Sequence, residues 1–334
     1  MNVPTNNALV EVDDLRVTFS SRDAQIAAVN GVSFTLDPGE VLCILGESGS
    51  GKSVTMRALM RLLPKNTAKI SGQVQIAGRD VVAMSDHDIA DMRGPVVSMI
   101  FQEPMTAFDP VFTIGDQIAE TIIRHEGVSR SDALARALEL LDLVQIPSAK
   151  SRLKNYPFEM SGGMRQRAMI ALALSCRPSL LLADEPTTAL DATVQIQILL
   201  LLRKLREELG MAIMFVTHDI GVAVEIADKL AVMYAGRFVE TGPVAEVFAK
   251  PAHHYTHGLM ASTVKQANKG RRLQAIDGSP PDLAALPPGC AFAPRCGRCD
   301  ATCQSAPPGL FDAGPNHSVA CYHPVASNEP AVAD

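Results

Sequence analysis

The octapeptide GESGSGKS at residues 46–53 constrains the fold of this chain more than any other feature. It follows a continuous apolar run, VLCIL at 41–45, and precedes a helix-like run, VTMRALMRLL at 54–63. Its glycines allow successive backbone N–H groups to point inward around an anion, and the following helix adds its positive N-terminal end. The pattern G-x-x-x-x-G-K-[ST] between a strand and a helix therefore predicts a loop that cradles phosphate groups.

Two side chains of this loop have predicted roles of their own. Lys52 is expected to reach the β- and γ-phosphates of a nucleoside triphosphate, and Ser53 is expected to ligate Mg²⁺. The alternative is a glycine-rich turn without a ligand, which the flanking strand and helix disfavour. The predicted nucleotide-binding residues of the loop are Gly46, Glu47, Ser48, Gly49, Ser50, Gly51, Lys52 and Ser53.

A second motif, LLLADEP at 180–186, supplies the acidic groups that such a loop needs. Its four apolar residues predict a buried strand that ends at Asp184, whose carboxylate is expected to hold Mg²⁺ through water and so to bind the nucleotide. Glu185 is placed to polarise the attacking water. The alternative is an acidic pair in an exposed loop, which the phosphate-binding motif in the same chain disfavours.

Composition and charge are those of an ordinary folded protein. Hydrophobic residues make up 47% and charged residues 20% of the 334 residues, a length that suits one large domain and a smaller one. The net charge of −6 argues against a broad nucleic-acid-binding surface. The N-terminal residues lack the pattern of a secretion signal, and no apolar run approaches the roughly 18–20 residues that span a bilayer. We therefore expect a cytosolic chain whose thiols stay reduced.

The pattern of apolar runs predicts an α/β fold. Continuous apolar runs at 41–45, 180–183 and 212–216 suit strands buried on both faces of a mostly parallel core sheet. Runs that alternate apolar and polar residues and carry glycine turns suit a separate, antiparallel β subdomain. These alternating runs lie at 11–20, 27–39 and 72–81.

Helical spacing and a change of composition divide the chain further. Between about 103 and 160 the apolar residues recur at helical spacing, as in ALARALELLDLVQI, so we expect a helical subdomain there. Residues 8–250 are assigned to the main domain. Beyond it the chain becomes proline-rich, which predicts an irregular connector and a small cysteine-rich module at 251–325. A disordered tail is expected at 326–334.

Five of the seven cysteines crowd the last fifty residues of the chain. The stretch CAFAPRCGRCDATC at 290–303 holds four of them, and Cys321 follows. Because cytosolic thiols stay reduced, disulfides are the least favoured interpretation. Metal ligands and free thiols are the two remaining interpretations. Cys43 and Cys176 are interpreted as small buried hydrophobic residues.

The segment FEMSGGMRQRAMIALAL separates this chain from many other proteins with a phosphate loop. Ser161, Gly162 and Gly163 precede a helix and predict a second anion site that a ligand can approach closely. Since the chain already has one phosphate loop, the second site is expected to serve the nucleotide of another subunit. With this motif the sequence resembles ABC transporter ATP-binding subunits, whose signature is usually written LSGGQ. Here Met160 and Met164 replace the outer Leu and Gln.

Other landmarks of that family follow in the expected order. Gln102 in IFQEP resembles the glutamine that senses the nucleotide, ligates Mg²⁺ and joins the helical subdomain. Asp191 in ALD resembles the family's D-loop aspartate, and His218 in FVTHD resembles the histidine that contacts the γ-phosphate. Phe19 in RVTFS lies where the family has an aromatic residue that stacks on adenine; the alternative is a core residue of an edge strand. The resemblance implies catalytic roles for Gln102, His218 and Glu185.

The resemblance covers roughly residues 8–325 and implies how the chain works. It implies a P-loop ABC-type nucleotide-binding domain with ATPase activity, and ATP and Mg²⁺ as its ligands. In the family, two subunits bind two ATP molecules head to tail, each between the Lys52-type residue of one chain and the Ser161-type residue of the other. Hydrolysis opens this sandwich and moves the membrane subunits between inward-facing and outward-facing states.

Two stretches narrow the resemblance to a branch of the family. Both resemble the corresponding sequences in the ATP-binding subunits of dipeptide and oligopeptide importers. The two stretches are IFQEPMTAFDPVFTIGDQIAE and GSPPDLAALPPGCAFAPRC. This resemblance implies import of peptides, with nickel, sugar or opine-like cargo as alternatives and an exporter or a soluble ATPase of translation or DNA repair as rivals. It also implies partners: a second, different ATPase subunit, two membrane-spanning permease subunits and an external solute-binding protein, with no nucleic acid. The chain is then expected at the cytoplasmic face of the inner membrane, as a peripheral protein.

In the same branch of the family, four spaced C-terminal cysteines resemble a [4Fe–4S] site. The resemblance therefore implies a cluster here, with Zn²⁺ and free thiols as the alternatives. Cys299 lies between two of the matching positions and has no assigned role. The matching positions are Cys290, Cys296, Cys303 and Cys321.

Overall fold

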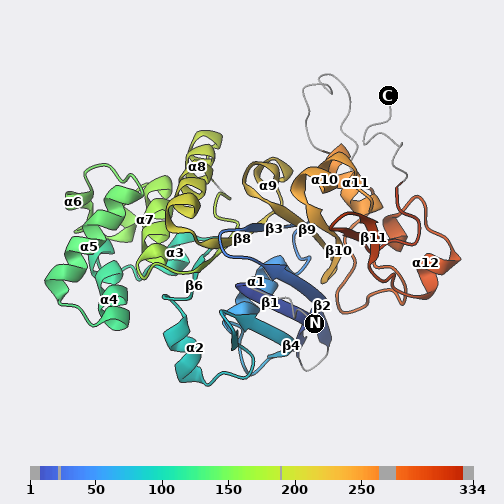
Figure 1. Cartoon of the computed structure of the whole chain (residues 1–334), viewed down its shortest axis with the longest axis horizontal. Coiled ribbons are helices and arrows are strands. Elements are labelled where there is room, and N and C mark those ends of the chain that lie inside the picture. Colours follow the sequence, from blue (N-terminus) through green and yellow to red (C-terminus); the bar gives the residue numbers. More distant parts are fainter. Residues whose placement is uncertain (1–7, 22–23, 189, 263–275, 326–334) are drawn as a thin grey trace, which may run out of the picture. The chain divides into compact units, whose positions relative to one another are not determined.

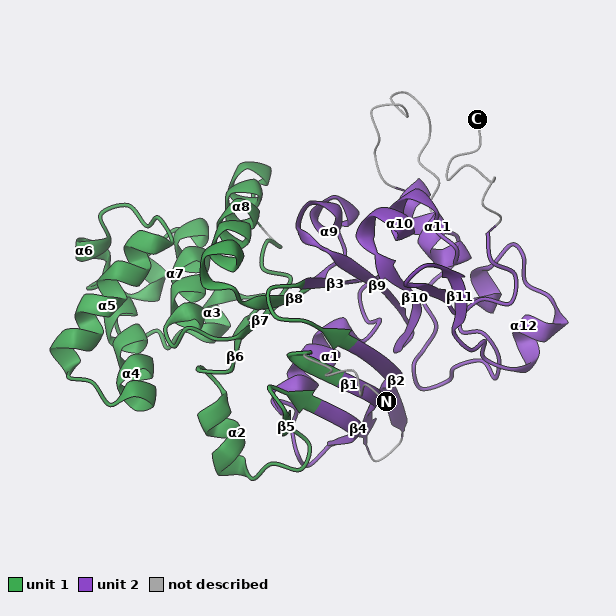
Figure 2. Cartoon of the chain, viewed as in Figure 1, with its two compact units in different colours: residues 1–11, 35–40, 75–215 green, residues 12–34, 41–74, 216–334 purple. Residues whose placement is uncertain are grey.

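The computed structural model describes residues 8–21, 24–188, 190–262 and 276–325 of the chain. The chain divides into two compact units, which Figure 2 shows in different colours. Unit 1 comprises residues 1–11, 35–40 and 75–215, and unit 2 comprises residues 12–34, 41–74 and 216–334. The disordered tail predicted at 326–334 lies outside the described residues.

The alternating runs of the sequence form a sheet of their own (Figure 1), as predicted. Most of this sheet belongs to unit 2 (Figure 2). Its strands there lie in the order β2-β1-β4. Along β1 the buried positions change phase between Val12 and Leu15. The change falls at Asp14, whose φ of 47° lies in the left-handed region that Asp tolerates better than most residues. The strands are β1 (Val10–Ser20), β2 (Gln25–Leu36) and β4 (Ala68–Ile76).

A second set of strands forms the core of unit 2. All five residues of β3 (Val41–Leu45) are buried, and β3 runs parallel to β9 (Lys229–Tyr234), as predicted for a strand covered on both faces. Antiparallel pairs then continue the sheet in the order β9-β10-β12-β11. These strands are β10 (Arg237–Pro243), β11 (Phe311–Gly314) and β12 (His317–Val319).

The strands β11 and β12 show that one expectation from the sequence was wrong. The C-terminal module was expected to be irregular, but β12 pairs with β10, with Val319 opposite Glu240. This pairing satisfies backbone groups of β10 that would otherwise form an open sheet edge. The proline-rich connector that precedes these strands, residues 278–296, has only one short 3-10 helix, as expected from its composition.

The helices of unit 2 are short, and α9 and α10 lie beside its core strands. The helix α9 packs on β3, and α10 packs on α9 and β10. Together these contacts cover apolar residues of the sheet and place the C-terminal elements next to it. The helices are α1 (Lys52–Leu59), α9 (Ile220–Ile226), α10 (Val244–Ala249), α11 (His254–Ala261), η3 (Ala293–Arg295) and α12 (Ala301–Ser305).

The strands of unit 1 carry the second half of the predicted core. The strands β6 (Val97–Ile100) and β7 (Leu180–Asp184) run parallel, and β8 (Ala212–Thr217) lies next to β7. Every residue of β7 and β8 is buried, as the continuous apolar runs predict. A short strand, β5 (Arg79–Asp80), pairs antiparallel with the last two residues of β4.

The helical segment predicted between about 103 and 160 contains α3 to α6. Local sequence sets its helix boundaries: Thr113 and Ser129 cap the starts of α4 and α5, and Gly127 takes the left-handed conformation that ends α4. The helices α4, α5 and α7 pack on one another, and α7 also packs on β6. No helix in the described part of the chain has the length and apolar character needed to cross a bilayer. The helices of unit 1 are α2 (Asp86–Met92), α3 (Pro104–Ala107), α4 (Ile114–Glu126), α5 (Arg130–Leu143), α6 (Ala149–Arg152), η1 (Pro157–Glu159), α7 (Gly162–Leu174) and α8 (Ala192–Leu209).

Candidate functional site

The phosphate loop of unit 2 starts at the end of β3 and runs into α1, as the sequence predicts. Gly51 is the N-cap of α1 with a φ of 107°, and Lys52 is its first residue. The Nζ atom of Lys52 donates hydrogen bonds to the carbonyl oxygens of Gly46 and Glu47, both at 2.8 Å. Phosphate oxygens are charged and therefore stronger acceptors than these carbonyls. Lys52 is thus held across the loop, where it can exchange carbonyl partners for phosphates.

Two glycines of the loop have no room for a side chain. A Cβ atom on Gly46 would lie 2.3 Å from the carbonyl oxygen of Met233, and one on Gly51 would lie 2.4 Å from that of Ala28. Gly49 has a φ of 79° but faces open space. The sequence explains these glycines by the conformational freedom of the loop. The structure adds a second reason for two of them, because neighbouring backbone lies against the loop.

One buried hydroxyl group of the loop lacks a protein partner. The Oγ atom of Ser50 is buried and has no hydrogen-bond partner among the described residues. Buried hydroxyl groups are nearly always satisfied, so this atom is expected to find its partner in a ligand or a water molecule. The carbonyl of Ser50 accepts a hydrogen bond from the backbone N–H of Gly236 at 2.8 Å, which fixes the loop backbone. The residues of the loop therefore fit the phosphate groups of a nucleotide.

Glu47 is held by two residues that the sequence did not reveal. Its backbone N–H donates to the Oη atom of Tyr255 at 3.0 Å, across 208 positions of sequence. Its carboxylate accepts two hydrogen bonds from Arg295, at 2.8 and 3.2 Å, across 248 positions. Tyr255 lies in α11 and Arg295 in η3. No local sequence pattern links residues so far apart, so these contacts become visible only in the fold.

Two further predicted residues lie at the ends of strands. His218 follows β8 directly and is exposed. Phe19 is the next-to-last residue of β1 and is half-buried. An exposed imidazole and a partly exposed ring are both accessible to a ligand. Contact of His218 with the γ-phosphate and stacking of Phe19 on adenine stay predictions.

In unit 1, the acidic pair stands at the end of β7. Asp184 is the last residue of the strand and is fully buried, whereas Glu185 is half-buried with a φ of 46°. A left-handed φ is uncommon for Glu, and such strain is found most often at functional sites. Gln102 donates a hydrogen bond from Nε2 to Glu185 Oε2 at 3.2 Å, and Thr188 Oγ1 donates to the same oxygen at 2.9 Å. The structure thus brings two predicted catalytic residues together and adds Thr188, which the sequence did not single out.

The signature motif lies at the start of α7. Ser161 is the N-cap, and its Oγ atom accepts a hydrogen bond from the backbone N–H of Met164 at 3.3 Å. A Cβ atom on Gly162 would meet nothing within 4 Å, whereas one on Gly163 would lie 3.1 Å from Val194 Cγ1. A side chain at Gly163 would therefore require the Val194 side chain of α8 to shift by a few tenths of an ångström. The open space at Gly162 is what close approach of a ligand to the backbone needs.

Asp191 has a structural role beside the predicted one. Its Oδ1 atom accepts hydrogen bonds from the backbone N–H groups of Thr193 and Val194, at 3.1 and 3.0 Å, and so caps α8. A cap of this kind stabilises a helix by about 1 kcal/mol. The predicted nucleotide contact of Asp191 stays a prediction.

Four of the five C-terminal cysteines line one small cavity in unit 2, and Cys299 is not among its lining residues. Burial raises the pKa of Cys321 to about 11, and the neighbouring Cys290, Cys296 and Cys303 also raise it. Cys321 therefore lies close enough to the other three thiols to be repelled by them when they ionise. A bound metal centre offsets this repulsion, because it holds thiols as thiolates.

Cys299 lies near enough to Cys290, Cys296 and Cys303 to raise the pKa of each, although it does not line the cavity. Its thiol donates to the carbonyl oxygen of Asp300 at 3.6 Å, and Gln304 Nε2 donates to its sulfur at 3.8 Å. Both contacts are exposed. The cavity thus separates the four cysteines that match the family positions from the fifth, whose role the sequence left open.

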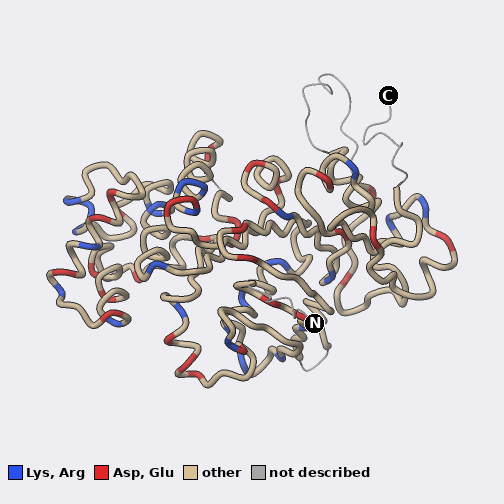
Figure 3. Tube along the Cα trace, viewed as in Figure 1, with Lys and Arg blue, Asp and Glu red and all other residues tan. Residues whose placement is uncertain are grey.

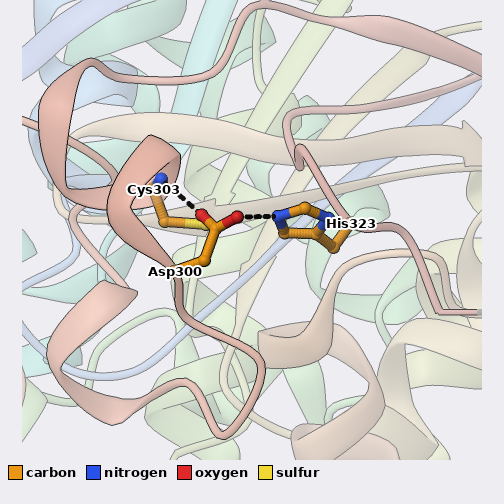
Figure 4. Close-up of side chains that lie close together, drawn as sticks. All are labelled: Asp300, Cys303 and His323. Carbon is orange, nitrogen blue, oxygen red and sulfur yellow. Dashed lines mark hydrogen bonds and ion pairs between the residues drawn. The ribbon is translucent and has the colours of Figure 1, made fainter.

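A polar pair lies beside one of the four cysteines, as Figure 4 shows. Asp300 Oδ1 accepts a hydrogen bond from the backbone N–H of Cys303 at 3.0 Å, and its Oδ2 lies 2.9 Å from Nε2 of His323. Sequence reasoning missed Asp300 and His323. A signal was present for one of them, since an Asp three residues before Cys303 suits the N-cap of a short helix.

The spacing of these groups bears on which metal centre the cysteines fit. Four thiolates on one Zn²⁺ ion, each about 2.3 Å from the metal, lie about 3.8 Å from one another. Within the described ranges, the group whose ligand atoms all lie within 4.8 Å of one another is Asp300, Cys303 and His323, rather than the four cysteines. A [4Fe–4S] cluster is larger than a single ion and joins thiolates that lie farther apart.

Comparison with known proteins gives two family matches in different parts of the chain. The ABC transporter family model matches residues 29–188. A model described as the oligopeptide/dipeptide transporter C-terminal region matches residues 239–303. Among solved structures, the chain resembles the dimeric ATP-binding cassette MJ0796 bound to ADP and Pi, with a TM-score of 0.64 and 28% identity over 70% of this chain and 98% of that one.

Curated relatives match over nearly the whole length. The oligopeptide transport ATP-binding protein OppD of Salmonella typhimurium is 47% identical over 96% of this chain and 95% of its own. The dipeptide transport ATP-binding protein DppD of Bacillus subtilis is 44% identical over 94% of each chain. With this identity, this coverage and the two family matches, the chain belongs to the ABC transporter ATP-binding proteins, in the branch that carries the oligopeptide/dipeptide transporter C-terminal region.

Proposed function

We propose that this chain hydrolyses ATP to power the import of peptides across the cytoplasmic membrane. The observation that carries the proposal is the double match, to the ABC cassette at 29–188 and to the peptide-transporter C-terminal region at 239–303. Relatives whose alignment covers nine tenths or more of the chain are named as oligopeptide, dipeptide and peptide import ATP-binding proteins. A soluble ATPase of translation or DNA repair is not expected to carry the peptide-transporter C-terminal region at 239–303.

Each unit carries residues with a role in the proposed chemistry. In unit 2, Lys52 supplies positive charge for the β- and γ-phosphates and Ser53 ligates Mg²⁺. In unit 1, Asp184 holds Mg²⁺ through water; the bound ion would neutralise charge that develops on the phosphates. Glu185 polarises the attacking water, and Gln102 holds the Glu185 carboxylate by the hydrogen bond at 3.2 Å. Positioning and electrostatic stabilisation of this kind account for most of the catalysis in phosphoryl transfer.

The signature motif supports a second ATPase subunit as partner. Ser161 and Gly162 are exposed at the N-terminal end of α7, which is thirteen residues long, so the positive end of a full helix faces solvent. We propose that this end binds the nucleotide held by the phosphate loop of the partner, and that the partner is a different chain. The similar cassette MJ0796 is a dimer in its solved structure.

Exposed apolar residues of unit 1 support a membrane partner. The large side chains of Met105, Val111 and Phe112 are 40%, 69% and 53% exposed and lie between β6 and α4. Large apolar side chains that gather on a surface mark interaction sites. We propose that they contact one of two membrane-spanning permease subunits, which places the chain at the cytoplasmic face of the inner membrane. An extracytoplasmic solute-binding protein then delivers the cargo to the permease.

The distribution of charge gives no support to a nucleic-acid partner. Positive and negative residues are interspersed along the trace of each unit (Figure 3). The net charge of −6 also opposes a broad contact with phosphate backbones.

We also propose that the four cysteines lining the C-terminal cavity hold a [4Fe–4S] cluster. Such a cluster would join α12, η3 and the segment after β12, three parts of a module that has little apolar core of its own. Its role is then structural rather than electron transfer. The ligands would be Cys290, Cys296, Cys303 and Cys321.

Reconstitution of the assembled importer tests the main proposal. The chain is expressed with the permease, the second ATPase subunit and the binding protein of the same transporter, and the complex is inserted into proteoliposomes. We expect uptake of a labelled peptide that depends on internal ATP and stops with Glu185→Gln in this chain. If the ATPase activity does not depend on peptide and the proteoliposomes take up nickel or a sugar instead, the cargo is that solute and not a peptide. Recovery of the chain only with ribosomes or DNA would contradict the transporter role.

A further inference from the structure

The C-terminal module reaches the phosphate loop through Tyr255, which accepts from the Glu47 backbone, and through Arg295, which binds the Glu47 carboxylate. Arg295 donates from Nη1 to Oε2 of Glu47 at 2.8 Å and from Nη2 to Oε1 at 3.2 Å. The Arg295 side chain is 5% exposed and that of Glu47 is 29% exposed. A bidentate pair of this kind fixes the orientation of both groups as well as their distance. The loop residue Glu47 therefore takes its position from a residue of another part of unit 2.

The guanidinium group of Arg295 is itself fixed from several sides. Its Nε atom donates to the carbonyl oxygen of Asp277 at 2.9 Å, and Nη1 lies 3.3 Å from the Oη atom of Tyr234. Its Cζ atom lies 5.8 Å from the ring centroid of Tyr234 and 5.9 Å from that of Phe292. These contacts restrict the guanidinium group of Arg295 to few orientations. The group is therefore already positioned to bind the carboxylate of Glu47.

The backbone of the loop is tied to the same surroundings. Tyr255 accepts the hydrogen bond from the N–H of Glu47 and is fully buried. Its ring centroid lies 4.6 Å from that of Tyr234 and 5.5 Å from that of Phe292. One aromatic cluster therefore supports both the residue that holds the Glu47 backbone and the residue that holds its carboxylate.

The turn that carries Arg295 also belongs to the cysteine cavity. Two of the lining cysteines, Cys290 and Cys296, bracket the turn. Backbone hydrogen bonds run from Ala293 N–H to Cys290 O at 3.0 Å and from Cys296 N–H to Ala293 O at 3.2 Å. Phe292 lines the same cavity. The position of Arg295 thus depends on how well this turn is held at its two cysteines.

We propose that Arg295 is a positioning residue of the phosphate loop, through which the C-terminal module controls the affinity for ATP. The proposal rests on ATP binding at this loop. A glycine-rich loop loses conformational entropy when it closes on a ligand, and a loop that is already fixed loses less. In addition, Arg295 neutralises the carboxylate of Glu47, which otherwise repels a triphosphate. Loss of Arg295 therefore weakens ATP binding and leaves the chemical step at Glu185 unchanged.

Equilibrium binding of a fluorescent ATP analogue to the full chain tests the proposal. We expect R295M to raise the Kd about 5- to 10-fold, the size of an ordinary coupling between sites. R295K keeps the charge without the bidentate geometry and is expected to lie between R295M and the wild type. R203M, which removes an exposed arginine–glutamate ion pair in α8, is the control and is expected to bind as the wild type does.

A second substitution distinguishes positioning of the phosphate loop by Arg295 from a general contribution of Arg295 to the stability of the fold. In E47Q/R295M the repelling carboxylate is gone together with its partner, so the Kd is expected to return to within about twofold of the wild-type value. A double variant as weak as R295M would overturn the proposal, because loss of folded structure cannot be repaired at Glu47. Wild-type affinity in R295M would also overturn it. A wild-type chain that binds no nucleotide would overturn the proposed function and this inference together.

The link to the cysteines is tested in the same assay. C290S is expected to raise the Kd in the wild-type background and to add nothing in the E47Q/R295M background. C299S, at a cysteine outside the cavity, is expected to change neither. An equal increase of Kd with C290S in both backgrounds would show that the module acts without Arg295, against the proposal.

Discussion

Gln102 and Glu185, 83 positions apart in sequence, are joined by a hydrogen bond of 3.2 Å from the amide of Gln102 to the carboxylate of Glu185. Glu185→Gln keeps the size of this side chain but removes its ability to polarise water. We expect ATP hydrolysis to fall by about 100-fold or more and ATP binding to persist. Phosphate release and nucleotide binding, measured on the assembled complex, check both expectations.

A neighbouring residue serves as the control for this prediction. Thr188 donates to the same carboxylate oxygen as Gln102, at 2.9 Å. Thr188→Val removes that donor and keeps the carboxylate, so its effect on hydrolysis is expected to be several-fold smaller than that of Glu185→Gln. Full activity in Glu185→Gln would remove Glu185 from the mechanism.

The glycines of the phosphate loop are predicted to differ in their tolerance of alanine. In Gly51→Ala the new Cβ atom would lie 2.4 Å from the carbonyl oxygen of Ala28, so backbone must move. In Gly49→Ala the Cβ atom meets only open space, and the cost is the positive φ, about 1–2 kcal/mol. We expect Gly51→Ala to abolish ATP binding and lower the Tm more than Gly49→Ala does. Thermal unfolding and nucleotide binding of the two variants measure the difference, and equal effects would contradict it.

The cysteine cavity predicts which substitutions remove a metal centre. Serine at any of the four lining positions is expected to lower the iron and sulfide content of anaerobically purified protein. Cys299→Ser is expected to retain the full content, because this thiol lies outside the cavity. Loss of iron in Cys299→Ser alone, or zinc in place of iron in the wild type, would contradict the assignment. The four positions are Cys290, Cys296, Cys303 and Cys321.

The thiol of Cys43 is predicted to be inert in the folded chain. It is fully buried in β3, and burial raises its pKa far above that of a free thiol. A raised pKa means that the reactive thiolate stays scarce even when the pH increases from 7 to 9. We expect alkylation followed by peptide mapping to find Cys43 unmodified in native protein across this range and modified after unfolding. Rapid labelling in the native chain would contradict the buried placement.

Features that depend on local sequence were predictable. The runs at 41–45 and 180–183 form buried strands because five or fewer consecutive apolar residues suit a strand covered on both faces. The phosphate loop lies where its motif requires, since its glycines, lysine and following helix are contiguous in the chain. The capping residues Thr113 and Ser129 likewise act within their own helices.

Features that depend on contacts across the chain were not predictable. The pair Arg295–Glu47 joins two segments through a turn whose shape no pattern encodes. The pairing of β12 with β10 escaped prediction because residues 317–319 are too few to give a periodic signal. For the cysteines, resemblance supplied the set of four, and only their shared cavity distinguishes them from Cys299.

The pairing of β10 with β12 has a consequence for biosynthesis. The carboxylate of Glu240 is fully buried in β10 and accepts hydrogen bonds from the backbone N–H groups of Ala252 and His253. It also lies 2.8 Å from Nε2 of His317, the first residue of β12. A nascent chain emerges from the ribosome N-terminus first, so β10 appears well before the segment that covers its edge. During that interval the core sheet presents an unprotected strand to other chains. Protection of this edge during synthesis is therefore expected only after β12 has emerged from the ribosome and paired with β10.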